Sequence, residues 1–251
     1  MERIETIDLD MLANRQLDDY KKVNPGTCFG DPEFELGIDV AYRLQDAVTG
    51  LRLKEGDGVA GYKIGCIGSD IKSQFGMSGP IRGTIFKSEI LSNGQELSAQ
   101  SYCNLAIEAE MAFTVGDNGQ IQDVFPVIEL HNLIFRGPKK TLAELIANNG
   151  INAGVIMPDR EMRNLNELDR AAEISLKINN LTFTTTEIWP IKNTPHGSLE
   201  WLETNLISHD LKVCSGNLVL AGTTLGLYPV QTGDVITVSL NGHALVMCSV
   251  K

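Results

Sequence analysis

The most constraining feature of the chain is the segment IEAEMAF, residues 107–113, where two glutamates lie one residue apart inside an apolar run. Successive side chains of a β-strand point to opposite faces, so the apolar residues would share one face, and Glu108 and Glu110 the other. Neighbouring carboxylates repel each other, and one is driven towards protonation unless a counter-charge lies close by. The segment therefore predicts a strand with one apolar face and one acidic face.

A divalent cation between the two carboxylates would remove this repulsion. An all-oxygen ligand set favours a hard ion, Mg²⁺ or Mn²⁺, over Zn²⁺. Glu129, alone in the apolar run PVIELHN, is a candidate third ligand. The alternative is that Glu108 and Glu110 lie on the solvent face of a half-buried strand, while Glu129 faces water or pairs with His131. Spacing alone leaves both interpretations open.

Lys63 is a lone cation in the strand-like segment GYKIGC. Beside a metal ion it would hold a substrate carboxylate or transfer a proton. The alternative is a lysine whose stem lies along the sheet while its charge reaches solvent. Five neutral side chains are candidates to form hydrogen bonds with an oxo acid, although roles in turns or helix caps explain their presence equally well. They are Asn148, Asn149, Asn152, Thr223 and Thr224.

The order of periodic segments predicts an α+β protein. Residues 35–53 carry apolar side chains at helical spacing, and the polar segment KEGDG, residues 54–58, ends this pattern. We therefore expect an N-terminal helical segment over residues 1–57 and a β-rich core over residues 58–251. Two short helices are predicted within that core, one beginning at the capping box of Thr141 and one following Ser198.

Strand-like segments dominate the second part of the chain. VAGYKIGCIG, from residue 59, and NLVLAGTTLG, from residue 217, read as strands, and two hairpins turn at Asn179-Asn180 and Asn241-Gly242. Many short strands with few helices predict a twisted, closed, mixed sheet.

Composition excludes several classes of function. Lys and Arg total 21 against 32 acidic residues, a net charge of -11, which disfavours nucleic acid and anionic membrane surfaces as partners. Neither a leader pattern nor an apolar run of membrane-spanning length is present, so we expect a cytoplasmic protein. Five cysteines without CxxC spacing argue against a disulfide framework and a thiolate zinc site.

Six segments, taken in order, resemble the fumarylacetoacetate hydrolase superfamily. They are GYKIG, GPIRGTIF, IEAEMAF, PVIELHN, HGSLEWL and LVLAGTTLGLYPVQTGDVITVSL. The branch most similar to the chain is that of the 2-keto-4-pentenoate hydratases and 4-oxalocrotonate decarboxylases. This resemblance implies a mixed β-roll with an N-terminal helical part, a homo-oligomer, and Mg²⁺ or Mn²⁺ held by Glu108, Glu110 and Glu129. It also implies catalytic roles for Lys63 and Glu129.

The chain departs from the hydratase pattern at two positions. Ala106 stands where the pattern has an arginine, and Ile81 stands where it has an acid. Arg82 and His131 are the candidates to compensate. The predicted substrate-binding residues are Arg82, His131, Asn149 and Thr223.

The resemblance implies a metal-dependent lyase that adds water to a small 2-hydroxydienoic or 2-oxo-enoic acid, as in the catabolism of aromatic compounds. Enolate stabilisation serves two further reactions, decarboxylation of a 2-oxo diacid such as oxalocrotonate and C–C hydrolysis of an acylpyruvate. A different class is a diverged, non-catalytic subunit that binds a 2-oxo acid, which the departures at Ala106 and Ile81 would favour.

Overall fold

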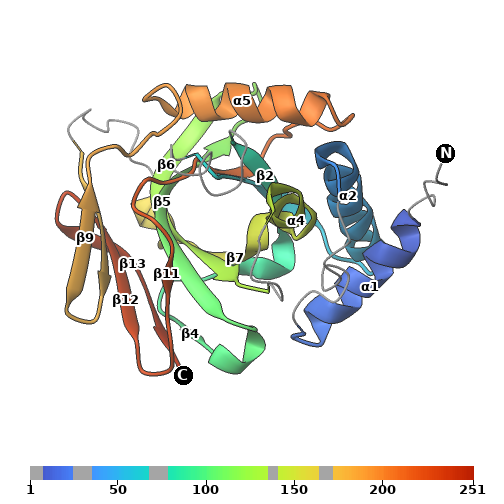
Figure 1. Ribbon diagram of the computed structural model, residues 1–251. Helices are drawn as coiled ribbons and strands as arrows, with labels where there is room; N and C mark the ends of the chain where they lie inside the picture. Colours follow the sequence, from blue (N-terminus) through green and yellow to red (C-terminus); the bar gives the residue numbers. More distant parts are fainter. Residues whose placement is uncertain (1–7, 25–35, 68–78, 135–140, 164–171) are drawn as a thin grey trace.

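The computed structural model describes residues 8–24, 36–67, 79–134, 141–163 and 172–251. Figure 1 shows a strongly curled sheet with helices along one side and a second, smaller sheet beside it. The expected α+β class with a mixed β-roll is therefore confirmed. No helix in these ranges combines the length and the apolar composition that crossing a bilayer requires.

Three helices pack together at one side of the curled sheet: α1 (Leu9–Lys21), α2 (Ile38–Lys54) and α4 (Leu142–Ala147). The helix α2 matches the periodicity read from residues 35–53, and Thr141 caps α4 as its capping box predicts. The helix α1 lies within the helical segment expected over residues 1–57, although its bounds were not predicted; it begins where Asp8 accepts a hydrogen bond from the amide of Met11. A shared apolar cluster, including Leu12, Leu44 and Ile146, holds these helices together.

The curled sheet has the strand order β2-β1-β10-β5-β6-β7-β3, with β11 paired to β5. Its strands are β1 (Val59–Gly65), β2 (Ile81–Phe86), β3 (Ile90–Leu91), β5 (Leu105–Val115), β6 (Ile121–Asn132), β7 (Asn152–Ile156), β10 (Leu218–Leu220) and β11 (Tyr228–Pro229). The edge strands β2 and β3 are joined by a single 3-10 turn, η2 (Lys87–Glu89). No hydrogen-bonded ladder joins β2 and β3, so the sheet is curled but open, and the prediction of a closed sheet is wrong for the described strands.

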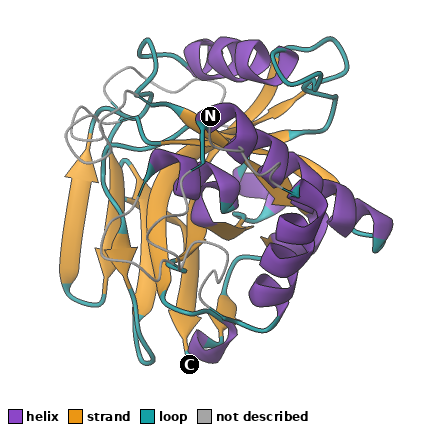
Figure 2. Ribbon diagram, turned by 45° about the vertical axis from the view of Figure 1, so that its right-hand side comes forward, coloured by secondary structure: helices purple, strands orange, loops and turns teal. Residues whose placement is uncertain are grey.

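The second sheet has the order β4-β13-β12-β8-β9 and contains both predicted hairpins. Its strands are β4 (Gln95–Leu97), β8 (Ile174–Ile178), β9 (Leu181–Thr185), β12 (Val235–Leu240) and β13 (His243–Val250). Three more 3-10 turns and one helix complete the described elements: η3 (Ala99–Ser101), η4 (Asn149–Ile151), η5 (Arg160–Met162) and α5 (Pro195–Ile207). Figure 2 shows the long strands side by side at the left and the packed helices towards the right.

The two faces of β5 serve different purposes. One face carries Ile107, Met111 and Phe113, which pack with the second sheet and with α5 in the main apolar core. The other face lines the inside of the curl, where a smaller apolar cluster around Phe125 and Leu220 fills one end. The charged residues discussed below occupy the remainder of this inner face.

Close approach of β1 and β10 depends on Gly61. These strands pair in parallel, and a Cβ atom at Gly61 would lie 1.8 Å from the backbone oxygen of Leu218. We expect Gly61→Ala to destabilise the protein by about 2 to 4 kcal/mol, measured by urea unfolding, because the strands must separate to admit the methyl group. Gly50→Ala in α2, where nothing lies within 4 Å of the added carbon, is the matched control and should not destabilise the protein. Equal stability of the two variants would contradict the strand geometry.

Candidate active site

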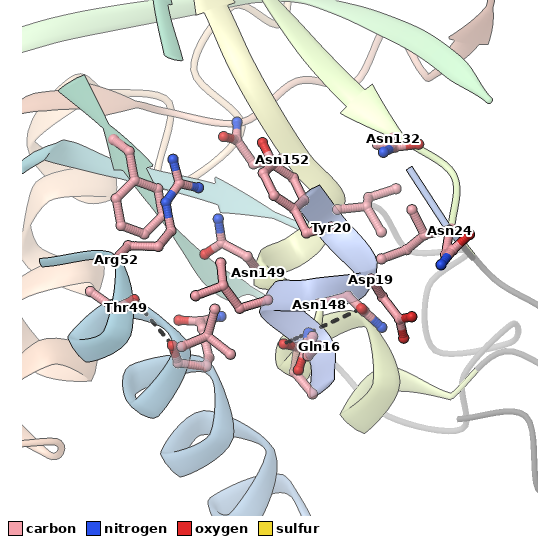
Figure 3. A pocket seen from close by; sticks show the side chains of 17 residues that line it. Gln16, Asp19, Tyr20, Asn24, Thr49, Arg52, Asn132, Asn148, Asn149 and Asn152 are labelled. Carbon is pink, nitrogen blue, oxygen red and sulfur yellow. Dashed lines mark hydrogen bonds between the residues drawn. The ribbon is translucent and has the colours of Figure 1, made fainter. Parts of the chain in front are cut away.

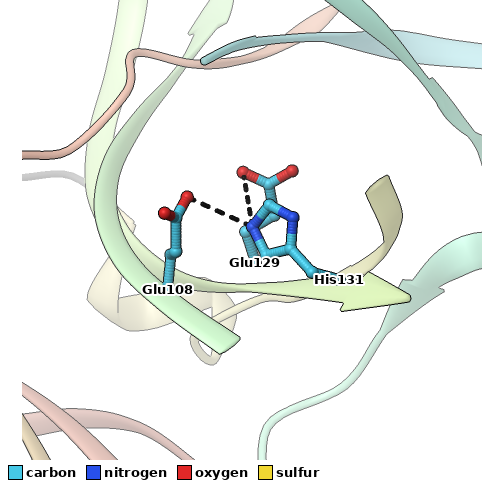
Figure 4. A group of neighbouring side chains, drawn as sticks. All are labelled: Glu108, Glu129 and His131. Atoms are coloured by element: carbon cyan, nitrogen blue, oxygen red, sulfur yellow. Dashed lines mark hydrogen bonds and ion pairs between the residues drawn. The ribbon is translucent and has the colours of Figure 1, made fainter. Parts of the chain in front are cut away.

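The antiparallel pair of β5 and β6 builds the centre of the site. In its register Glu108 lies opposite Glu129, and Ala106 lies opposite His131. Residues two apart on a strand share a face, so Glu108, Glu129 and His131 all point into the curl, as Figure 4 shows. The His131 Nε2 atom lies 3.1 Å from Glu108 Oε2 and 3.5 Å from Glu129 Oε2. One donor atom from each of these three side chains lies within 4.8 Å of the other two.

The carboxylates of the inner face carry oxygen atoms without partners. Glu110 and Glu129 are buried, whereas Glu108 is partly exposed. Both oxygens of Glu110 and the Oε2 atom of Glu129 lack a hydrogen bond from any described residue. Unsatisfied buried anions are costly, and a divalent cation is the partner that carboxylate oxygens suit best. The described residues therefore fit a metal ion.

Burial and mutual repulsion set the protonation of these acids. Burial, and then the charges of Glu129 and Glu108, raise the pKa of Glu110 well above its ordinary value of 4.5. Burial alone would also raise the pKa of Glu129, but the nearby His131 and Lys63 hold it below that value. In the absence of an ion, the inner face therefore favours the ionised form of Glu129 and the protonated form of Glu110.

Lys63 reaches this group from β1. Its Nζ atom lies 3.1 Å from Glu129 Oε1, and the amide of Asn152 donates to the same oxygen at 2.8 Å. Burial alone would lower the pKa of Lys63, but the charges of Glu129, Glu108 and Glu110 outweigh it and raise the pKa. The lysine is buried and protonated, so the solvent-directed alternative is wrong.

Two glycines make room for the Lys63 side chain. A Cβ atom at Gly150 would lie 3.0 Å from Lys63 Cε, and one at Gly83 would lie 3.1 Å from Lys63 Cγ. Gly150 belongs to the turn η4, and its φ of 59° lies in the left-handed region that favours glycine. The turn η4 therefore covers the lysine stem and holds its charge against Glu129.

The other predicted polar residues have different partners. Arg82 faces away from Lys63 and binds the carboxylate of Asp46 in α2 at 2.8 Å. Asn149 bonds the backbone of Thr84 through both its amide nitrogen and its amide oxygen. The hydroxyl of Thr223 accepts the amide of Leu225. The contacts among the described residues thus link none of Arg82, Asn149 and Thr223 to the carboxylates, and their binding of substrate stays a prediction.

The remaining polar candidates divide between structure and site. Asn148 donates to the Glu144 carbonyl and accepts from Gln16, as the capping interpretation predicts. The hydroxyl of Thr224 lies 3.3 Å from that of Thr185. Asn152 alone among these candidates contacts a carboxylate of the inner face, because it donates to Glu129. The sequence left Asn152 open between a hydrogen bond to an oxo acid and a turn or capping role, and did not predict this contact.

The two departures from the hydratase pattern have clear structural consequences. Ala106 is the cross-strand neighbour of His131, so an imidazole lies beside the position of the missing arginine. Ile81 lies on the Lys63 face of the sheet, since Lys63 pairs with Gly83, and Ile81 with Gly65. Its buried side chain joins the apolar cluster of the helices. This wall of the site is therefore apolar where the pattern has an acid.

A separate pocket lies between α1, α2 and the segment 147–152 (Figure 3). Its lining includes Tyr20, Phe86 and several asparagines, among them Asn152. The Arg52 guanidinium in its wall is bound by Glu89 and Asp57 at 2.6 and 2.8 Å. This arginine is thus engaged in ion pairs, and the ionisable cluster that suits catalysis lies instead at Glu108, Glu129 and Lys63.

The chain is similar in sequence to several hydratases. A comparison with models of protein families found no match. The chain is 26% identical over 234 residues to the 2-oxo-hept-4-ene-1,7-dioate hydratase of Escherichia coli, covering 85% of this chain and 87% of that protein. Further relatives at 22–23% identity are also named as hydratases, including 2-keto-4-pentenoate hydratase 1 of Dechloromonas aromatica.

Solved structures show the same fold. The 4-oxalocrotonate decarboxylase of Pseudomonas putida G7, complexed with magnesium and adipate, aligns over 100% of both chains with a TM-score of 0.88 and 20% identity. The fumarylpyruvate hydrolase of Pseudomonas aeruginosa, complexed with Mn²⁺ and pyruvate, aligns over 75% of this chain and 88% of that chain, with a TM-score of 0.55 and 14% identity. The resemblance to the hydratase and decarboxylase branch is therefore confirmed.

The raised pKa of Glu110 predicts an unusual dependence of stability on pH. In EDTA the folded protein keeps a proton on Glu110 that the unfolded chain releases near pH 4.5, so this residue's contribution to stability declines as pH rises towards the folded pKa. We expect Glu110→Gln to be more stable than the wild type by more than about 1 kcal/mol at pH 8, with the difference shrinking towards pH 4. Urea unfolding across this range measures it.

The matched control is Glu203→Gln, a substitution of an exposed residue in α5. Its stability should follow that of the wild type at every pH. A Glu110→Gln variant that is less stable than the wild type at pH 8 in EDTA would contradict the protonated state of the buried acid.

Proposed function

We propose, from the premise that the chain has the fumarylacetoacetate hydrolase fold and resembles the hydratase and decarboxylase branch in sequence, that it is a divalent-metal-dependent lyase. Its reaction is the addition of water to a small 2-hydroxydienoate or 2-oxo-enoic acid such as 2-keto-4-pentenoate, in the catabolism of aromatic compounds. The single observation that supports the proposal most is the group of buried carboxylates with unsatisfied oxygens beside the buried Lys63.

Glu108, Glu110 and Glu129 would hold the ion, which we propose to be Mg²⁺ or Mn²⁺. Magnesium, calcium and manganese are bound in the solved relatives, and carboxylate oxygens suit all three ions. A bound divalent ion would supply Lewis-acid stabilisation of the negative charge that develops on the C2 oxygen as the dienol becomes a ketone.

The protein's own residues would orient the substrate and transfer protons. Lys63 is protonated and buried, so it can bind the substrate carboxylate or donate a proton to the substrate within hydrogen-bond reach. Asn152 and Lys63 together hold the Glu129 carboxylate from one side, which leaves its Oε2 atom free to face the ion. The apolar wall at Ile81 would exclude water from that side of the substrate.

A second candidate reaction is the decarboxylation of a 2-oxo diacid. The structural match to 4-oxalocrotonate decarboxylase along the whole chain favours it, and both reactions need the same stabilised enolate. Hydrolysis of an acylpyruvate would in addition need a base that activates water.

We further propose that the protein is cytoplasmic and forms a homo-oligomer. Sedimentation analysis would measure the oligomeric state.

A panel of three substrate types tests the proposed reaction. With Mg²⁺ or Mn²⁺ we expect the wild type to hydrate a 2-hydroxydienoate. The loss of the substrate's ultraviolet absorbance measures the rate, and mass spectrometry identifies the product. Glu129→Gln should abolish ion binding in calorimetry as well as turnover, because it removes a ligand charge. Release of CO₂ from a 2-oxo diacid without hydration would instead establish the decarboxylase. Ion binding without turnover of a dienoate, a diacid or an acylpyruvate would establish a non-catalytic subunit.

Lys63→Met separates a role in chemistry from a role in ion binding. We expect turnover to fall by about 100-fold or more, since the substrate loses its cation or proton donor. The affinity for Mg²⁺ should not fall, because the substitution removes a competing positive charge near Glu129. Calorimetry and steady-state kinetics measure the two effects. Lys177→Met, at an exposed position of β8, is the control. Unchanged turnover in Lys63→Met would exclude the lysine from the mechanism.

A further inference from the structure

The position of His131 in the carboxylate group has a geometry that suits an ion. Two ligands that bind one ion at about 2.1 Å lie about 3.0 Å apart at right angles and about 3.4 Å apart at a tetrahedral angle. The Nε2 atom of His131 lies 3.1 Å from Glu108 Oε2 and 3.5 Å from Glu129 Oε2. These two separations match those between adjacent ligands of a single ion.

A hydrogen bond alone accounts for only part of this arrangement. A single N–H group at Nε2 satisfies Glu108, and the Oε2 atom of Glu129 then has no hydrogen-bond partner among the described residues. An ion beside Nε2 would satisfy both carboxylates and the Nε2 atom of the imidazole. The Nδ1 atom, which is also buried without a hydrogen-bond partner in the described part of the chain, would then carry the ring proton.

The surrounding residues keep the imidazole directed into the site. His131 is buried, and it lies on β6 two residues from Glu129, so both side chains share the inner face. Its cross-strand neighbour is Ala106, whose side chain is a single methyl group. The ring is therefore close to the ion position and no long side chain separates them there.

We propose that His131 Nε2 is a direct ligand of the metal ion, alongside the oxygens of Glu108 and Glu129. This inference rests on the proposed function, since it concerns the same ion. The ligand set then contains nitrogen and oxygen, and it selects Mn²⁺ over Mg²⁺, because imidazole suits transition ions whereas Mg²⁺ prefers oxygen alone.

Pulsed electron paramagnetic resonance of the Mn²⁺-bound protein detects a coordinated nitrogen directly. We expect the wild type to show ¹⁴N modulation that changes to a ¹⁵N pattern when histidine is labelled with ¹⁵N. His131→Gln should lose the nitrogen signal, and His243→Gln, at an exposed position of β13, should retain it. The ratio of Mg²⁺ to Mn²⁺ dissociation constants, from calorimetry, should fall by about tenfold or more in His131→Gln.

The outcomes separate this inference from the proposed function. If Mn²⁺ binds the wild type in a way that Glu108→Gln abolishes, but no histidine nitrogen is coupled to it, His131 is not a ligand and the proposed lyase still stands. If neither Mg²⁺ nor Mn²⁺ binds the wild type, the proposed function and this inference both fail. The labelled wild type needs no substitution, so a folding defect in His131→Gln would not affect the decision.

Discussion

Burial of like charges inside the curled sheet is the constraint on which the rest of the structure depends. Transfer of a carboxylate from water into a protein costs several kcal/mol unless partners compensate for the lost hydration. Glu110 and Glu129 are both buried, and Lys63 forms an ion pair with Glu129. The inner face thus carries more negative charge than its lysine can balance. This excess of negative charge favours the binding of a divalent cation by the folded protein.

The helical part serves this site by supporting the strands from outside. Arg82, fully buried, lies 4.9 Å from the ring centre of Tyr42 and pairs with Asp46, so it fastens α2 to β2. In the last turn of the same helix, Arg52 forms ion pairs with Glu89 and Asp57. Each arginine thus ties α2 to the segment around one end of β2. Their charges stabilise the wall behind Lys63 and do not enter the inner face.

Much of the fold could be predicted from local patterns. The alternation around Glu108, the capping box at Thr141 and the hairpin turn at Asn241 are short-range signals, because strand pleat and turn geometry act within a few residues. The helix α1 lies within the helical segment expected over residues 1–57, but its bounds were not predicted, because the helix is polar on average and its apolar side chains pack against α2 and α4. The division at residue 57 stays a prediction.

The candidate site was predictable in its acids and less so in its other members. Glu108 and Glu129 could be identified from the sequence because each is a charged residue in an apolar strand-like segment, and their cross-strand register brings them together. The direction of Arg82 depends on which face of an edge strand the helices cover, a long-range property that spacing does not encode. For Asn152 the partner lies on the neighbouring strand, and for His131 the useful signal was its position two residues after Glu129.

A change of register in β5 would disturb both faces of the strand. Its carboxylates and its core side chains alternate along a single stretch, with the ion position on one side and the second sheet on the other. Loss or gain of one codon within Ile107–Phe113 would exchange these sides, placing acids in the apolar core and methyl groups at the ion. Substitution can therefore change the chemistry of this strand without moving its faces, whereas an insertion or deletion keeps both faces in place only in the loops that flank it.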